Sequence, residues 1–160
     1  IPEAGLASPL EALLARAGRS RALRWGRSDG EVERATSRLL ERVGIAEQAD
    51  VVCGALSLSD LKRLEFCLAV AADPVLLLLD EPTAGMSMAE RAALIELVGA
   101  EVRRRGMTVL FTEHDMDMVF AAATRIMVIQ HGAILAEGTA QEVRTKRDVQ
   151  QVYLGAAPDR

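Results

Sequence analysis

An unbroken apolar run at residues 75–79 is the feature that most limits how this chain can fold. Val75 and the four leucines after it contain no polar residue, which predicts a strand buried on both faces, as in a parallel sheet. Asp80 and Glu81 follow directly, where such a strand would end. Ligands of open parallel sheets bind outside the carboxyl ends of the strands, and an acid pair there can hold Mg²⁺ and act on water. A buried strand followed by a solvated turn is the alternative interpretation.

The residues after the acid pair predict a helix and a second strand. Ser87 and Glu90 form a Ser-x-x-Glu capping box, and Gly106 is placed to end the helix that follows. A second apolar strand at residues 109–111 leads into His114. Because the crossover of a βαβ unit is right-handed, the two strands should run parallel. We therefore expect the acid pair and His114 to meet at one edge of one sheet.

Helices are also predicted before the apolar run, and a hairpin is predicted after it. The apolar spacing at residues 11–17 and 32–43 indicates two helices, the second with a capping box that begins at Ser28. Strands at residues 126–129 and 133–135 flank a turn and should pair as a hairpin.

Two arginine-rich segments are interpreted as solvated surface. Arg103, Arg104 and Arg105 suit the negative end of the predicted helix, and a solvated helix end is favoured over a phosphate site. A second basic stretch at residues 16–27 surrounds Trp25. A solvated connection is favoured there over docking against an acidic surface or lipid headgroups.

The segment Leu77–Thr83, followed by Glu113–Asp115, resembles the Walker B strand and switch segment of ABC transporter ATPase subunits. The resemblance implies an α/β fold: the C-terminal part of a P-loop NTPase (RecA-like) core with a mainly parallel sheet, plus an α-helical subdomain. It implies ATP and Mg²⁺ as cofactors. Asp80 would then act on Mg²⁺ through water, Glu81 would be the catalytic glutamate that polarises the attacking water, and His114 would be the switch histidine at the γ-phosphate.

Residues 56–60 lie where this family has its signature, usually Leu-Ser-Gly-Gly-Gln, at the start of a helix. The resemblance implies that Ser57, Ser59 and Asp60 contact the nucleotide bound by the partner subunit, at a helix N-terminus that favours anions. Ser59 replaces a glycine, so its hydroxyl either adds a contact or crowds the phosphate. Plain helix capping is the alternative interpretation of both serines.

Gly85, Met86 and Ser87 lie where the family has its D-loop, which meets the partner subunit. Ser87 stands in place of the usual aspartate, so the resemblance implies no carboxylate role there. No Gly-x-x-x-x-Gly-Lys-Ser/Thr loop occurs in the sequence, which begins with Ile1. Because that loop cradles the phosphates, we expect a C-terminal portion of a longer ATPase that is inactive by itself.

The resemblance also implies how the chain divides and what it binds. We expect a helical subdomain over residues 1–72 that ends in the signature helix, an ATPase core portion over 73–137, and a C-terminal helical extension over 138–160. The implied partners are a second ATPase subunit in a homo- or heterodimer, transmembrane permease subunits and, indirectly, a solute-binding protein. The implied location is cytoplasmic, peripheral on the cytoplasmic face of the cell membrane.

Composition excludes several other classes of protein. A net charge of −4 and an aromatic content of 3% disfavour nucleic-acid binding, which needs a basic face and stacking platforms. Cys53 and Cys67 are too few for a disulfide scaffold. No apolar run reaches the ~20 residues of a membrane-spanning helix.

The tail at residues 148–155, with Ala84–Ser87 and His114–Met116, favours the ATPases of branched-chain amino acid importers. Urea importer and lipopolysaccharide export ATPases have a similar ending. A catalytically inactive regulatory or interaction module is an alternative, supported by the missing P-loop and the altered signature. A soluble ABC ATPase of translation or repair is disfavoured, because neither a tandem cassette nor a basic face is visible.

Overall fold

The computed structural model describes residues 7–19 and 29–153 of the chain. The chain divides into two compact units, Ile1–Thr112 and Glu113–Arg160. The basic stretch around Trp25, the cap at Ser28 and the end of the tail at Gly155 lie outside the described residues. Among the described helices, none has the length and apolar character needed to cross a membrane.

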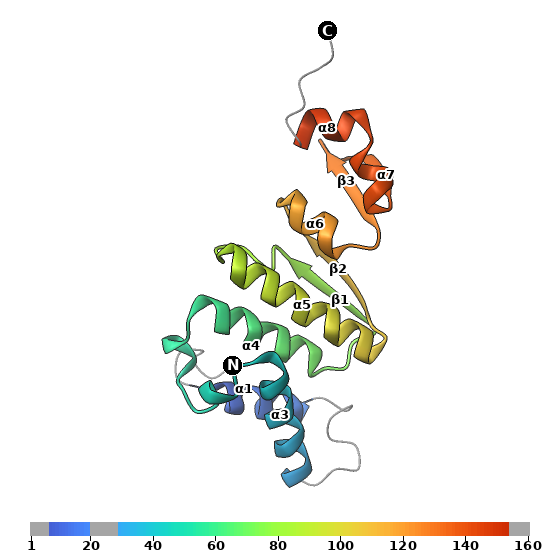
Figure 1. Ribbon diagram of the computed structural model, residues 1–160. Coiled ribbons are helices and arrows are strands. Elements are labelled where there is room, and N and C mark those ends of the chain that lie inside the picture. The colour runs from blue at the N-terminus through green and yellow to red at the C-terminus, as the bar shows by residue number, and fades with distance from the viewer. Residues whose placement is uncertain (1–6, 20–28, 154–160) are drawn as a thin grey trace. The chain divides into compact units, whose positions relative to one another are not determined.

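The first unit contains helices and a pair of parallel strands (Figure 1). In chain order its elements are α1 (Pro9–Arg19), α3 (Asp29–Val43), the short 3-10 helices η1 (Ala46–Gln48) and η2 (Cys53–Ala55), α4 (Leu58–Val70), β1 (Leu76–Asp80), α5 (Met88–Arg105) and β2 (Thr108–Thr112). Helices were predicted at the positions of α1, α3, α4 and α5, and the structure confirms all four.

Strands β1 and β2 form the predicted βαβ unit with α5. They run parallel in a register that pairs Leu76 with Thr108 and Asp80 with Thr112. Helix α5 begins with the predicted capping box and ends at Gly106, whose φ of 66° is left-handed. Glycine adopts that conformation without steric cost, which is why the helix stops there.

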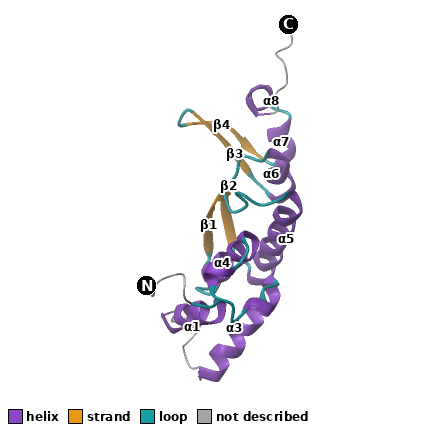
Figure 2. Ribbon diagram, turned by 90° about the vertical axis from the view of Figure 1, so that its left-hand side faces the viewer, coloured by secondary structure: helices purple, strands orange, loops and turns teal. Residues whose placement is uncertain are grey.

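The prediction that β1 is buried on both faces is wrong for the described chain. Leu77 is buried in a core that includes Leu64 of α4 and Leu94 of α5, whereas Leu76 and Leu78 are 53% and 66% exposed. The two helices lie on one side of the strands (Figure 2), so only the side chains that point to that side lose contact with water. An unbroken apolar run therefore does not reveal whether a strand is covered on one face or on both.

The interpretation of Arg103–Arg105 as a solvated helix end is also incomplete. Glu101, in the same helical turn, is only 3% exposed and forms ion pairs with Arg104, Arg105 and Arg42 of α3. Burial raises the pKa of the Glu101 carboxyl, but the hydrogen bonds from Arg104 and Arg105 and the charges of Arg104 and Arg42 outweigh that effect and lower the pKa to about 2. Two of the three arginines thus hold a buried carboxylate.

The second unit has its own small core. Its elements are α6 (Met116–Ala122), β3 (Ile126–Gln130), β4 (Ala133–Gly138), α7 (Ala140–Arg144) and α8 (Arg147–Tyr153). The antiparallel pairing of β3 with β4 confirms the predicted hairpin, with His131 and Gly132 at positive φ in the turn. Ile126, Val128 and Val149 are among the residues buried between the hairpin and its helices.

Candidate functional site

The end of the parallel strand pair brings Asp80 beside Thr112. The two residues are register partners, and the Thr112 hydroxyl donates a hydrogen bond of 2.5 Å to Oδ1 of Asp80. Asp80 is exposed. The hydrogen bond fixes the carboxylate at the carboxyl edge of the strands and leaves acceptor positions on its oxygens for a ligand or for water.

Thr112 also holds the backbone of Glu81, the residue at which the chain leaves the sheet. The Glu81 N–H lies 3.1 Å from the Thr112 hydroxyl oxygen and 3.2 Å from the Thr112 carbonyl oxygen, and donates to both. Glu81 has a φ of 43°, a left-handed conformation that is uncommon for a residue with a side chain. Such strain persists where surrounding contacts enforce it, and it is frequent at functional sites. The two acids are thereby anchored by one threonine.

The turn after the acid pair is fixed by buried side chains. Thr83 and Met86 are 1% and 4% exposed, and the Met86 N–H donates to the Thr83 carbonyl. Arg91 Nε donates to the Met86 carbonyl at 2.9 Å. Gly85 has a φ of 78°, which requires glycine or a strained substitute. The predicted D-loop residues therefore form a rigid turn between β1 and α5.

Ser87 serves as the N-cap of α5. Its hydroxyl accepts from the Glu90 N–H and donates to the Glu90 carboxylate at 2.6 Å. The hydrogen bonds from the Ser87 hydroxyl and N–H lower the pKa of Glu90. A serine that completes a capping box has a structural role, and any contact with a partner subunit stays a prediction.

The predicted signature residues occupy the first turn of α4. The Ser57 hydroxyl accepts from the Asp60 N–H at 3.1 Å and donates to Asp60 Oδ2 at 2.7 Å. Ser57 is thus the N-cap of the helix, as the alternative interpretation expected. Ser59 lies in the same turn and is partly exposed. Capping does not exclude nucleotide contact, because a helix N-terminus still presents free N–H groups to an anion.

The fold brings the start of α4 against the D-loop turn. A methyl carbon of Leu58 lies 2.9 Å from the position that a Cβ on Gly85 would occupy. Leu58 itself is 47% exposed. The first turn of α4 and the turn after the acid pair are therefore adjacent. Glycine at residue 85 is favoured by its positive φ, whereas the Leu58 methyl is the end of a flexible, exposed side chain that can rotate away.

His114 lies two residues beyond the end of β2, in the second compact unit. It is exposed and directly precedes Asp115, the N-cap of α6, whose carboxylate accepts from the Met118 N–H. The approach of His114 to Glu81 was predicted from the parallel pairing of β1 and β2, which the structure has. That approach stays a prediction.

The oxygen groups at this edge suit a hard cation that keeps most of its water. Asp80 supplies a carboxylate and Thr112 a hydroxyl, and Mg²⁺ typically binds through one or two carboxylates, waters and substrate phosphates. Within residues 7–19 and 29–153, no three His, Cys, Asp or Glu side chains gather into a metal-binding group. A cavity of about 150 Å³ also opens beside Asp80, with Lys62 and Pro82 in its lining. The residues fit a site completed by phosphate oxygens.

Thr112 is the site residue that sequence analysis missed. The signal was present, because Thr112 ends the second predicted strand where a parallel partner would place it next to Asp80. It was overlooked because a threonine in a strand is usually there for its β-branched shape.

Comparison with known proteins identifies relatives that are longer than this chain. No protein-family model matches the sequence. The high-affinity branched-chain amino acid transport ATP-binding protein LivG of Salmonella typhimurium is 39% identical over 118 residues, which cover 74% of this chain and 46% of LivG. The corresponding protein BraF of Pseudomonas aeruginosa is 37% identical over 131 residues, covering 82% of this chain and 51% of BraF. The chain thus spans about half the length of these relatives.

A solved structure described as an ATP-binding cassette of an ABC transporter has a similar fold. Its TM-score is 0.77 at 26% sequence identity, and the match covers 96% of this chain and 65% of that one. The predicted mixed α/β fold with a parallel strand pair is confirmed.

Proposed function

Because this chain belongs to the ABC transporter ATPases, we propose that it is the part of an ATP-hydrolysing importer subunit that carries the catalytic acids. The observation that supports this most strongly is the edge formed by Asp80, Glu81 and Thr112. There, two exposed acidic residues lie at the end of a parallel strand, and one threonine binds the carboxylate of Asp80 and the backbone N–H of Glu81.

Each residue at this edge has a distinct task in the proposed reaction. Asp80, kept in place by Thr112, would hold Mg²⁺ through water. Glu81 orients and polarises the water that attacks the terminal phosphate. His114 contacts the γ-phosphate. When bound with ATP at this edge, Mg²⁺ would supply positive charge that stabilises the transferred phosphate.

The phosphate-binding loop is proposed to come from sequence outside these residues. The printed sequence contains no such loop, and the chain spans about half the length of its relatives. We therefore expect the isolated chain neither to bind ATP tightly nor to turn it over. Measurable Mg-ATP turnover by the 160 residues, lost in Glu81→Gln, would contradict this.

The first turn of α4 and the D-loop turn are proposed to face a second ATPase subunit. Ser57, Ser59 and Asp60 would approach the nucleotide of that subunit, and Gly85 and Met86 would lie beside them. The contact between Leu58 and Gly85 supports this, because it makes the two segments one continuous surface. Dimer closure around ATP would then drive transmembrane permease subunits, with the ATPase on the cytoplasmic face of the membrane.

Branched-chain amino acids are the proposed cargo, received by the permease from a solute-binding protein. The support is that LivG and BraF are named for their transport. The complete ATPase, encoded by the open reading frame that includes this sequence, can be reconstituted with its permease in vesicles. ATP-dependent uptake of labelled leucine is the expected result. ATP-dependent uptake of urea without leucine would refute the cargo but not the ATPase, whereas no turnover in any assembly would favour an inactive regulatory module.

A further inference from the structure

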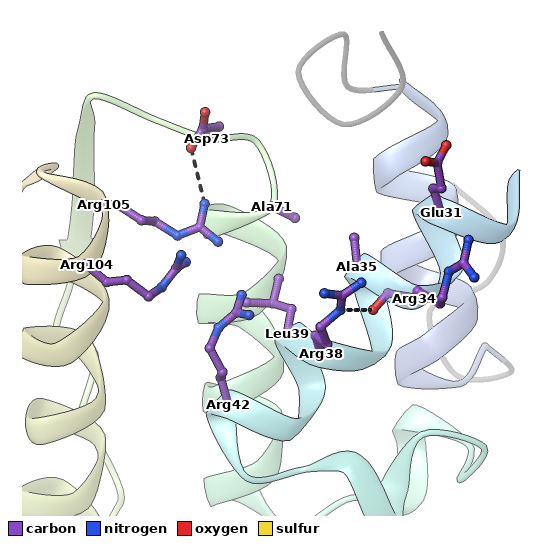
Figure 3. A pocket seen from close by; sticks show the side chains of 10 residues that line it. All are labelled: Glu31, Arg34, Ala35, Arg38, Leu39, Arg42, Ala71, Asp73, Arg104 and Arg105. Atoms are coloured by element: carbon purple, nitrogen blue, oxygen red, sulfur yellow. Dashed lines mark hydrogen bonds and ion pairs between the residues drawn. The ribbon is translucent and has the colours of Figure 1, made fainter. Parts of the chain in front are cut away.

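A second concave site in the first unit is lined mainly by arginines (Figure 3). Its volume is about 620 Å³, within the range of small-ligand pockets. Helix α3 contributes one arginine in each of three successive turns, and the end of α5 contributes two more. The lining residues used below are Arg34, Arg38, Arg42, Arg104, Arg105 and Asp73.

This cavity lies at the opposite end of β1 from the acid pair. Asp73 in its lining precedes the strand, whereas Asp80 ends it. A strand rises ~3.3 Å per residue, so β1 alone separates the two regions by roughly 13 Å. The cavity is thus distinct from the proposed catalytic edge, and the inference below does not rest on the proposed function.

Buried Glu101 orients the inner arginines so that part of each guanidinium remains available. Arg42 donates to Glu101 Oε1 through Nε alone, at 3.1 Å. Arg104 donates through Nε and Nη2, and Arg105 through Nε, with its Nη1 reaching the Val70 carbonyl and Asp73. Within the described residues, no partner is found for the Nη groups of Arg42 or for Nη1 of Arg104.

The outer two arginines have no acidic partner within the described residues. Arg38 uses Nε to donate to the Arg34 carbonyl, and neither Arg34 nor Arg38 forms an ion pair there. Like charges four residues apart on a helix repel each other, and the acidic residues at i,i+3 spacing, Glu31 and Glu41, offset only part of the repulsion in the series Arg34, Arg38, Arg42. Of these three arginines, Arg42 alone forms an ion pair within the part of the chain that the structure describes, with Glu101.

The cavity is positive although the chain is not. Five arginines and two acidic residues line the cavity. When Glu101 is counted with the acidic residues, the arginines still outnumber the carboxylates by two. The chain as a whole has a net charge of −4. A local excess of guanidinium groups with unused N–H donors is the arrangement that recognises phosphate oxygens, because the planar fork can donate two parallel hydrogen bonds.

We propose that this cavity binds a phosphate-bearing anion between α3 and the end of α5. The bound phosphate accepts hydrogen bonds from Arg34, Arg38 and the free Nη groups of Arg42, and it relieves the repulsion along α3. The same chemistry is offered by a free polyphosphate anion and by the headgroup of an anionic lipid, and the experiment below separates these sources.

The test uses the 160-residue chain and two double variants matched in charge. Arg34→Gln with Arg38→Gln removes the two unpaired guanidinium groups. Arg103→Gln with Arg147→Gln removes two exposed arginines that do not line the cavity. Circular dichroism melting first establishes that the parent chain and both variants fold, so that absence of binding by the parent is a property of the folded chain. Titration calorimetry with inorganic pyrophosphate at low salt measures one source, and flotation with phosphatidylcholine–phosphatidylglycerol vesicles, against phosphatidylcholine alone, measures the other.

If a free anion is the ligand, the parent and control chains bind pyrophosphate. Affinity then falls roughly tenfold for each guanidinium that is removed from the cavity. Flotation with the anionic vesicles only, lost in Arg34→Gln with Arg38→Gln but kept in the control, supports the site with a lipid headgroup as ligand. The proposal is overturned if neither probe binds the parent chain, or if both double variants lose binding equally.

Discussion

Two regions of the first unit contain carboxylates in opposite environments. Glu101 is 3% exposed and is surrounded by Arg42, Arg104 and Arg105. Asp80 and Glu81 are exposed at the end of β1, where a neutral residue, Thr112, binds the Asp80 carboxylate and the Glu81 N–H. The first region neutralises its carboxylate within the chain, whereas the hydroxyl of Thr112 in the second region holds the Asp80 carboxylate without neutralising its charge.

This contrast separates an acid that stabilises the fold from acids that are available for chemistry. A carboxylate that is already paired with three cations has little capacity left for a metal or for water. A carboxylate held by a single hydroxyl, like that of Asp80, keeps its charge and most of its acceptor positions. Substitutions in the two regions should therefore affect different properties, stability in one and activity in the other.

The largest expected effect on stability is that of Glu101→Gln. Loss of the carboxylate leaves three guanidinium groups close together without a counter-charge, so the free energy of unfolding should fall by about 3 kcal/mol. Urea denaturation followed by circular dichroism measures it. Glu81→Gln, at the exposed edge, should change the same quantity by less than about 0.5 kcal/mol. Equal losses in the two variants would remove the distinction between the regions.

Acid should weaken the Glu101 cluster selectively. Folding lowers the pKa of this carboxyl from its ordinary 4.5 to about 2, so its contribution is complete above the higher value and is lost as the pH falls from 4.5 towards 2. The contribution amounts to up to about 3 kcal/mol. Urea denaturation across this pH range should show parent and Glu101→Gln chains converging in stability. A constant gap between them would show that the carboxylate is not the titrating group.

Thr112→Val tests how the exposed acids are held. It keeps the β-branched shape but removes the hydroxyl that contacts Asp80 and the Glu81 N–H, so we expect a loss of about 1 kcal/mol. Thr108→Val is the matched control, because Thr108 begins the same strand and is exposed. In the complete ATPase, the Thr112 variant should also turn over ATP more slowly than the control. Identical behaviour of both variants would remove Thr112 from the site.

The smallest expected effect is that of Ser87→Ala, which breaks the capping box of α5 beside the D-loop turn. Loss of an N-cap costs about 1 kcal/mol or less. Thr139→Ala, which breaks the equivalent box of α7 in the second unit, provides a comparison of similar size. If Ser87 only caps its helix, both variants should leave ATP turnover unchanged in the complete enzyme. A drop in turnover confined to Ser87→Ala would give that residue a role at the subunit contact.

Local sequence patterns predicted the elements of this fold well. The capping box at Ser87 and the terminating Gly106 each depend on residues within a few positions of one another. The parallel pairing of β1 and β2 followed from the handedness of βαβ units. These signals need no knowledge of the rest of the chain.

Contacts between distant residues could not be predicted in the same way. Arg42 and Glu101 are 59 positions apart, so the burial of Glu101 was invisible even though Arg104 and Arg105 are in helical reach of it. Leu76 and Leu78 were expected to be buried because an apolar run does not reveal how many faces are covered. The closeness of Leu58 to Gly85 likewise depends on how α4 packs.

The most direct test of the central claim is Mg-ATP turnover by the complete ATPase carrying Glu81→Gln, compared with Glu96→Gln on the exposed face of α5. If Glu81 polarises the attacking water, turnover should fall by about 10²-fold or more while the Kd for ATP stays unchanged, and Glu96→Gln should behave like the parent. Equal turnover in the two variants would contradict the assignment of the strand edge as the catalytic site.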